Sequence, residues 1–240
     1  MSESDEPIPT AEEARAEVRR RFDDRAPTYD ESAMHRGLAD AVAGFVLEAG
    51  APGDVLDVAT GTGLVLRALR ERDQRSVPGR PGDRTATGRM IGVDLAPRML
   101  EVARTHLPEA ELIEADAASL PLPDDCVDLV TCVTGLQLFT DVPGAIREWA
   151  RVLRPGGRVV TATFVAFDPS RHRAAPPAAM LHHEPFRSPE ALDETFAPVG
   201  LRVARHERWT DGADDLLIAE LVSGRGDHEG AAAEGRAPLH

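Results

Sequence analysis

Three aspartates each end a short apolar run, and a glycine-rich turn follows the first of them. The first run leads into Asp57-Val58-Ala59-Thr60-Gly61-Thr62-Gly63, the second ends at Asp94 and the third at Asp116. Glycines after a strand let the backbone approach a ligand closely, and the following helix offers free N–H groups at its N-terminus. A tight turn without any ligand would share this glycine pattern. The three acids favour a ligand that bears hydroxyls and positive charge, because they would repel an anionic pyrophosphate.

The elements that must position these acids alternate between strand and helix. Apolar runs predict strands over 54–58, 90–94, 110–116, 127–133 and 158–164, and helical patterns between them cover 64–72, 97–107 and 141–154. Further helices are expected over 12–22, 35–49 and 189–197, with a terminal hairpin over 201–209 and 215–222. Such alternation implies right-handed crossovers and a parallel sheet, whose ligands bind at the carboxyl ends of the strands. We therefore predict an α/β, Rossmann-like, doubly wound and mostly parallel seven-stranded sheet with an antiparallel C-terminal hairpin strand.

The organisation along the chain predicts one domain over residues 10–222. Within it we expect an N-terminal helical lid (10–45), a flexible surface insertion rich in Pro, Gly and Arg (70–89) and a substrate-side cap (165–188). Residues 1–9 and 223–240 have no apolar periodicity and are expected to be disordered tails.

The composition of the 240 residues excludes several classes of function. A net charge of −14 opposes binding to nucleic acid or to an anionic membrane surface, because both depend on neutralising phosphates. All 27 basic residues are arginines, which rules out lysine Schiff bases and a Walker A phosphate site. No apolar run approaches the ~20 residues that span a bilayer, and the N-terminus has no signal-peptide pattern. Cys126 and Cys132 need no disulfide, so we expect a cytoplasmic protein.

Three cofactor classes use a glycine turn of this kind. A nucleoside triphosphate in a P-loop is excluded by the missing lysine. A dinucleotide prefers G-x-G-x-x-G, whereas Gly61-Thr62-Gly63-Leu64-Val65-Leu66 lacks the third glycine, so a nicotinamide-dependent oxidoreductase is the weaker alternative. The third class is S-adenosylmethionine, whose sulfonium charge and ribose hydroxyls suit an acidic rim.

Four segments of the sequence resemble the motifs of a known family. DVLDVATGTG, GVDLAPRMLEVAR, EADAASLPLPDDCVDLVTCVTGLQLF and REWARVLRPGGRVV resemble, in order, the motifs of class I S-adenosylmethionine-dependent methyltransferases. The resemblance covers roughly residues 20–165 and is strongest to the small-molecule branch that includes ubiquinone/menaquinone-biosynthesis enzymes. The upstream RFDDRAPTYDESA also resembles that branch, in which a tyrosine-aspartate pair lies over the cofactor. One departure is Ala59, where the family usually has the first glycine of its turn.

The resemblance implies roles for residues that would bind S-adenosylmethionine. Asp57 would order the turn and meet the methionine amino group, and Asp94 would hold the ribose hydroxyls. Asp116 would accept the adenine amino group, and Tyr29, the one tyrosine of the chain, would close the lid. The other implied cofactor contacts are Ala59, Gly61 and Gly63 in the turn, Leu95 and Met99 beside the adenine, Ala117 at a ring nitrogen, and Thr134, Leu136 and Gln137 between cofactor and substrate.

The reaction implied is in-line methyl displacement, in which the protein mainly aligns donor and acceptor. If the acceptor must lose a proton, His35 in the lid and His183 in the cap are the candidate bases, with His172 and His182 as further histidines of the cap. The pair His182-His183 has no further ligand at metal-binding spacing, so no metal is expected. The caps contain apolar groups, which suits a small, partly apolar acceptor. Whether the acceptor atom is carbon, oxygen or nitrogen stays open, as does the oligomeric state, a homodimer included.

A further alternative comes from the fold class itself. A methyltransferase-like scaffold can keep the cofactor for a rearrangement or cyclisation, or can lose it, without a change of architecture. Tight cofactor binding without turnover would distinguish that case from methyl transfer.

Overall fold

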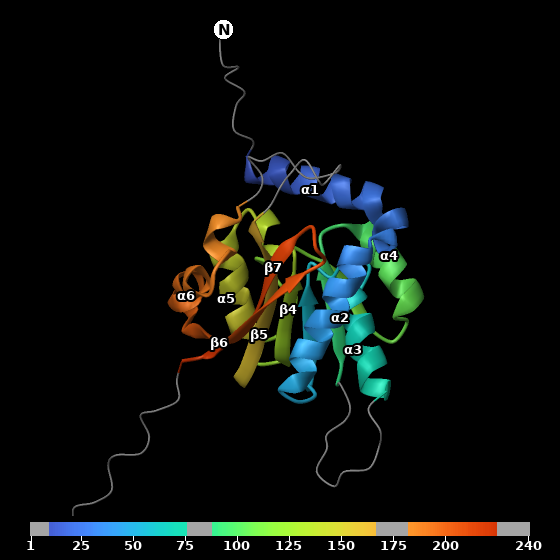
Figure 1. The fold of residues 1–240 in the computed structure, drawn as a ribbon. Helices are drawn as coiled ribbons and strands as arrows, with labels where there is room; N and C mark the ends of the chain where they lie inside the picture. The colour runs from blue at the N-terminus through green and yellow to red at the C-terminus, as the bar shows by residue number, and fades with distance from the viewer. Residues whose placement is uncertain (1–9, 76–87, 167–181, 225–240) are drawn as a thin grey trace, which may run out of the picture.

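The computed structural model describes residues 10–75, 88–166 and 182–224. Its centre is a seven-stranded sheet in the order β3-β2-β1-β4-β5-β7-β6 (Figure 1). Strands β1 (Val55–Val58), β2 (Met90–Asp94), β3 (Glu111–Glu114), β4 (Val127–Val133) and β5 (Leu153–Ala166) are parallel. Strands β6 (Leu201–Thr210) and β7 (Asp215–Ser223) form an antiparallel hairpin, and β7 pairs with β5. The predicted fold is confirmed.

Helices cover both faces of this sheet (Figure 1). They are α1 (Ala11–Arg25), α2 (Ala33–Glu48), α3 (Leu64–Arg75), α4 (Pro97–His106), α5 (Val142–Val152) and α6 (Pro189–Phe196), with 3-10 segments η1 (Ala26–Glu31), η2 (Leu136–Leu138), η5 (Glu184–Phe186) and η6 (Ala197–Val199). The amphipathic helix α5 buries Ile146 and Trp149 on one face of the sheet, together with Phe196 of α6. Helices α2 and α3 bury Leu38 and Leu66 on the opposite face. The two hydrophobic layers leave the strand ends free to form a site.

Several boundaries differ from the sequence predictions. Helix α3 runs to Arg75, so the first residues of the predicted 70–89 insertion are helical, and 76–87 lie outside the described residues. Helix α5 ends at Val152 and β5 begins at Leu153, because Leu153 already pairs with Val127 before the register shifts at Pro155-Gly156-Gly157. Strand β7 extends to Ser223, the first residue of the predicted C-terminal tail. The tail residues 1–9 and 225–240, and 167–181 of the predicted cap, are not among those described.

The strand order reverses between β1 and β4, and this is where ligands of such sheets bind. The turns that leave these two strands touch each other, since a Cβ on Gly135 would lie 2.8 Å from the Cβ of Ala59. Ala59 and Thr134 both have left-handed backbone conformations, with φ of 56° and 55°. Such conformations are uncommon for residues other than glycine and occur preferentially at functional sites.

Within the described part of the chain, no helix has the length and apolar character needed to cross a membrane.

Candidate functional site

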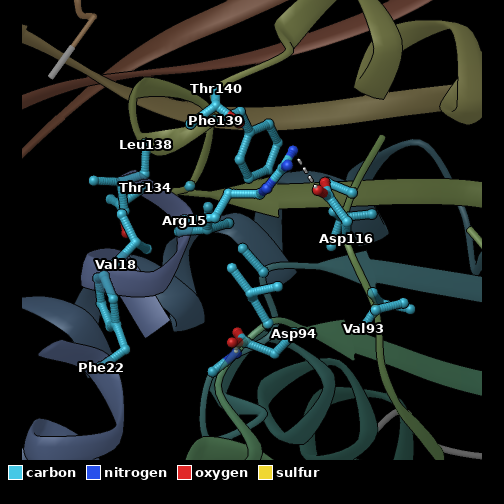
Figure 2. Close-up of a pocket in the computed structure, with 18 of the residues that line it drawn as sticks. Arg15, Val18, Phe22, Val93, Asp94, Asp116, Thr134, Leu138, Phe139 and Thr140 are labelled. Atoms are coloured by element: carbon cyan, nitrogen blue, oxygen red, sulfur yellow. Dashed lines mark hydrogen bonds and ion pairs between the residues drawn. The ribbon is translucent and has the colours of Figure 1, made fainter. Parts of the chain in front are cut away.

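A cavity lies at the carboxyl ends of β1, β2 and β4, beneath α1 and η1 (Figure 2). Helix α1 crosses the edge of the sheet above it (Figure 1). The cavity is lined by residues of α1 and η1 and by residues at the strand ends and in the segments that follow them: Arg15, Val18, Phe22, Tyr29, Val58, Ala59, Gly61, Val93, Asp94, Leu95, Ala115, Asp116, Ala117, Val133, Thr134, Gly135, Leu138, Phe139 and Thr140. Two carboxylates on a largely apolar wall therefore face one cavity.

The cavity brings together most of the residues that the resemblance implied as cofactor contacts. Those that line it are Tyr29, Ala59, Gly61, Asp94, Leu95, Asp116, Ala117 and Thr134. Asp57 lines a smaller neighbouring cavity together with His35. The side chains of Met99 and Leu136 are fully buried in the core, and Gly63 packs against Leu107 of the segment after α4. Gln137 is buried as well, and its Nε2 donates a hydrogen bond to the carbonyl of Thr134 over 2.7 Å.

Asp94, the last residue of β2, forms part of the site and also shapes it. Its Oδ2 accepts a hydrogen bond from the N–H of Gly61, and its Oδ1 accepts one from the N–H of Ala96, both at 2.8 Å. Burial raises the pKa of this carboxyl to about 6. The carboxylate thus holds the glycine turn of β1 against the end of β2 and still lines the cavity.

Asp57 has a different environment, although it lies near the end of the strand that leads into the same turn. The residue is 2% exposed, and its two oxygens accept hydrogen bonds from the hydroxyls of Thr60 (2.7 Å) and Thr131 (2.6 Å). Burial raises the pKa of Asp57 to about 6 as well, with a smaller contribution from the charge of Asp94. Two hydroxyl donors let the carboxylate order the turn after β1 from inside the protein.

Helix α1 supplies residues of the cavity that the sequence reasoning missed. Arg15 forms an ion pair with Asp116 over 3.2 Å, and its side chain extends along the cavity towards that carboxylate (Figure 2). Val18 and Phe22 line the same wall. No residue of α1 is fully buried, so the helix lies over the site without joining the main core. The spacing of Arg15, Val18 and Phe22 along one helical face was the signal that could have indicated this role.

The ring of Tyr29 forms the boundary between the two cavities, since it lines both. It stacks on the imidazole of His35 with ring centroids 4.3 Å apart, and the guanidinium of Arg25 lies 5.2 Å from its centroid. Burial raises the pKa of Tyr29 to about 12, so the phenol keeps its proton and remains a hydrogen-bond donor.

A third cavity of about 450 Å³ adjoins the first one and shares Phe139 and Thr140 with it. Its other lining residues are Val142, Pro143, His182, His183, Glu184, Pro185 and Phe186. Burial lowers the pKa of His183, which keeps the imidazole neutral at neutral pH and able to accept a proton. The two predicted bases therefore line different cavities, His35 beside Asp57 and His183 beside Phe139. His172 lies outside the described residues.

The described residues contain no group of three or more histidine, cysteine or acidic side chains arranged to hold a metal ion. Both cysteines are buried free thiols.

The comparisons with known proteins agree with this geometry. A methyltransferase domain family matches residues 56–161, from β1 into β5. The chain is 41% identical over 118 residues to a demethylmenaquinone methyltransferase of Thermus thermophilus, which covers 48% of each chain. It is 34% identical over 173 residues to a demethylmenaquinone methyltransferase of Deinococcus radiodurans, covering 68% of this chain and 66% of the relative. The matches thus span about half to two thirds of the length of these curated relatives.

A solved structure shares the same architecture at lower sequence identity. It is the 1,6-didemethyltoxoflavin-N1-methyltransferase of Burkholderia thailandensis, whose structure contains 1,6-didemethyltoxoflavin and S-adenosylhomocysteine. Its TM-score is 0.65 at 16% identity, with 91% of this chain and 92% of that chain covered. By its family match and its sequence relatives, the chain belongs to the class I S-adenosylmethionine-dependent methyltransferases; these relatives include enzymes of the ubiquinone/menaquinone-biosynthesis type and malonyl-[acyl-carrier protein] O-methyltransferases.

Proposed function

We propose that this protein transfers the methyl group of S-adenosylmethionine to a small-molecule acceptor. The observation that carries the proposal is Asp94, a cavity-lining carboxylate that also fixes the glycine turn through the N–H of Gly61. An acceptor of two hydrogen bonds at this strand end suits a ribose diol, and the neighbouring acidic rim suits a cationic ligand.

The cavity residues fit the parts of this cofactor. Asp94 would hold the ribose hydroxyls, and Asp116 with Ala117 would meet the adenine edge, against the apolar Leu95. The methionine end would lie towards the smaller cavity of Asp57, under the ring of Tyr29. When bound, the cofactor supplies a methyl group already activated by its sulfonium leaving group.

The protein's own part in the reaction is to orient the acceptor and to exclude water. The third cavity supplies the acceptor side, because it meets the cofactor cavity at Phe139 and Thr140. Its aromatic and apolar walls favour a partly apolar metabolite. An acceptor that must lose a proton would pass it to the neutral imidazole of His183, whereas His35 stacks beneath Tyr29 on the other side of the site.

We further propose that residues 10–222 act as one domain. Only α1 and η1 of the predicted lid lie over the cavity, while α2 packs on the sheet through Leu38 and Val42. The substrate-side cap would include η5, whose Phe186 lines the third cavity.

The experiment that tests the function is calorimetric titration of the purified protein with S-adenosylmethionine and with S-adenosylhomocysteine. We expect micromolar binding of both, followed by methyl transfer to members of a panel of phenols, amines and enolisable carbons. The variant Asp94→Ala should weaken cofactor binding far more than His183→Ala. Equal losses would refute the map of the site, and no binding to folded protein would refute the function. Tight binding without transfer to any acceptor would favour a rearrangement or cyclisation on the same scaffold.

A further inference from the structure

Asp30 follows Tyr29 in η1, and its side chain serves a different part of the structure. Its Oδ1 accepts a hydrogen bond from the hydroxyl of Thr62 at 2.5 Å, and its Oδ2 pairs with Nη1 of Arg67 at 2.5 Å. Nε2 of His106 lies 4.0 Å from the same Oδ2. One carboxylate thus connects η1 to the glycine turn, to α3 and to the end of α4. Asp30 lines neither the cofactor cavity nor the smaller cavity beside it.

The segment η1 has few buried residues of its own. Ala26 is its one fully buried residue, and the ring of Tyr29 packs against the small cluster of Ala96 and Met99 and stacks on His35. By contrast, the contacts of Asp30 are sheltered: the side chains of Asp30 and Arg67 are 29% and 21% exposed, and Thr62 is fully buried. Polar contacts in such surroundings are worth more than the same contacts in open water.

The position of Tyr29 depends on this segment. Cε1 of Tyr29 lies 3.9 Å from the point where a Cβ on Gly61 would stand, so the ring rests directly on the glycine turn. Thr62, the hydroxyl partner of Asp30, is the next residue of that turn. Anchoring residue 30 to residue 62 therefore fixes residue 29 against residue 61.

We propose that Asp30 is a positioning residue that clamps η1 to the glycine turn through Thr62 and Arg67, and so holds Tyr29 over the cofactor. The proposal rests on the proposed function for its consequence, but the clamp itself consists of contacts between protein groups alone. Loss of the clamp removes no side chain that would contact the cofactor, but it lowers the fraction of molecules in which Tyr29 closes the site. The apparent dissociation constant rises by the inverse of that fraction.

The single tyrosine of the chain permits a direct measurement of this position. Incorporation of 3-fluorotyrosine gives one ¹⁹F resonance, which reports Tyr29 alone. In Asp30→Ala without ligand, we expect the resonance to move towards that of the free amino acid, and the dissociation constant of S-adenosylhomocysteine to rise about tenfold. The matched control is Asp40→Ala, which removes the ion pair of α2 with Arg72 (2.7 Å) and touches neither cavity. This control should leave both readouts unchanged.

Two further variants keep the test independent of the stability of Asp30→Ala. Asp30→Asn keeps an acceptor for Thr62 but loses the ion pair, so it should shift the resonance in the same direction by a smaller amount. Arg67→Ala should shift the resonance by the same amount as Asp30→Asn. The double variant Asp30→Asn with Arg67→Ala should shift it little further, as in a double-mutant cycle of coupled residues. An unshifted resonance in Asp30→Ala and Asp30→Asn, or an equal shift in Asp40→Ala, would overturn the clamp. A shifted resonance in a protein that binds no cofactor would support the clamp and refute the proposed function instead.

Discussion

The substitution Asp94→Asn removes the ionisable group at the centre of the proposed cofactor site and keeps its size. The wild-type carboxylate offers one oxygen to Gly61 and the other to Ala96. An asparagine has a single carbonyl oxygen, so one of these N–H groups loses its acceptor. This loss should lower the free energy of unfolding by about 1–3 kcal/mol.

The cofactor affinity should fall for a separate reason. Hydrogen bonds to a charged acceptor contribute about 1.5–3 kcal/mol and those to a neutral one about 1 kcal/mol, so the ribose contact should weaken by about 0.5–2 kcal/mol. The dissociation constant of S-adenosylhomocysteine should therefore rise about 2- to 30-fold at neutral pH.

The pH dependence distinguishes this residue from others. Burial raises the pKa of Asp94 to about 6, so the carboxylate becomes protonated as the pH falls through that value. One pH unit below it, about one carboxylate in ten remains ionised, and wild-type affinity should be about two- to eightfold weaker, because the neutral form still binds weakly. Asp94→Asn lacks this ionisation, so its affinity should fall less than that of the wild type over the same range.

Calorimetric titration with S-adenosylhomocysteine from about pH 5 to about pH 8 measures both effects. The control is Asp57→Asn, because burial raises the pKa of Asp57 to about 6 as well. Asp57 binds the hydroxyls of Thr60 and Thr131, so its variant should keep the acid-side loss of affinity. The reasoning is refuted if Asp94→Asn retains the wild-type pH profile while Asp57→Asn abolishes it.

Three further predictions concern the turn and the lid. Ala59→Gly relieves a left-handed φ of 56° and should raise the melting temperature by about 1–3 °C in scanning calorimetry. Asp125→Gly, at a φ of 51° outside the site, should give a comparable or smaller rise, and a fall for Ala59→Gly would contradict the strain argument. Gly63→Ala places a Cβ 2.7 Å from Leu107 at a φ of +79°, so the free energy of unfolding in urea should fall by about 2–4 kcal/mol. An unchanged unfolding midpoint would show that the segment of Leu107 moves to make room for the methyl group. Arg15→Ala frees the carboxylate proposed for the adenine, so the dissociation constant of S-adenosylhomocysteine should fall about two- to fivefold in calorimetry, whereas a rise would make this arginine a cofactor contact.

Much of the candidate site followed from local patterns in the sequence. Apolar runs bounded by turns predicted the parallel strands, and parallel strands end at the same edge of a sheet. Asp94 and Asp116 could therefore be placed on one rim without coordinates, and both line the cavity. The antiparallel hairpin and the free cysteines could also be predicted, because they depend on hydrophobic periodicity and residue type.

The directions of the side chains at the carboxyl ends of the strands could not be predicted in this way. Met99 and Gln137 carry the right residue types near the site, yet both side chains are buried away from the cavities. Asp57 lies one residue before the end of β1 and Asp94 ends β2, but hydroxyls from the turn and from β4 enclose the first, while the second stays at the cavity wall. These outcomes depend on which neighbour each strand receives, and strand order is a property of the whole sheet.

The sequence by itself determined the sheet, the acidic rim and the glycine turn, because these depend on periodicity over short stretches. Only the tertiary structure decided what covers the rim. Arg15 reaches Asp116 across 101 residues, and Asp30 reaches Thr62 across 32 and Arg67 across 37. The tertiary structure also places His35 and His183 in different cavities. The physical reason is that α1 and η1 have little buried surface of their own, so a few polar contacts to distant elements set their place, and no local pattern predicts these contacts.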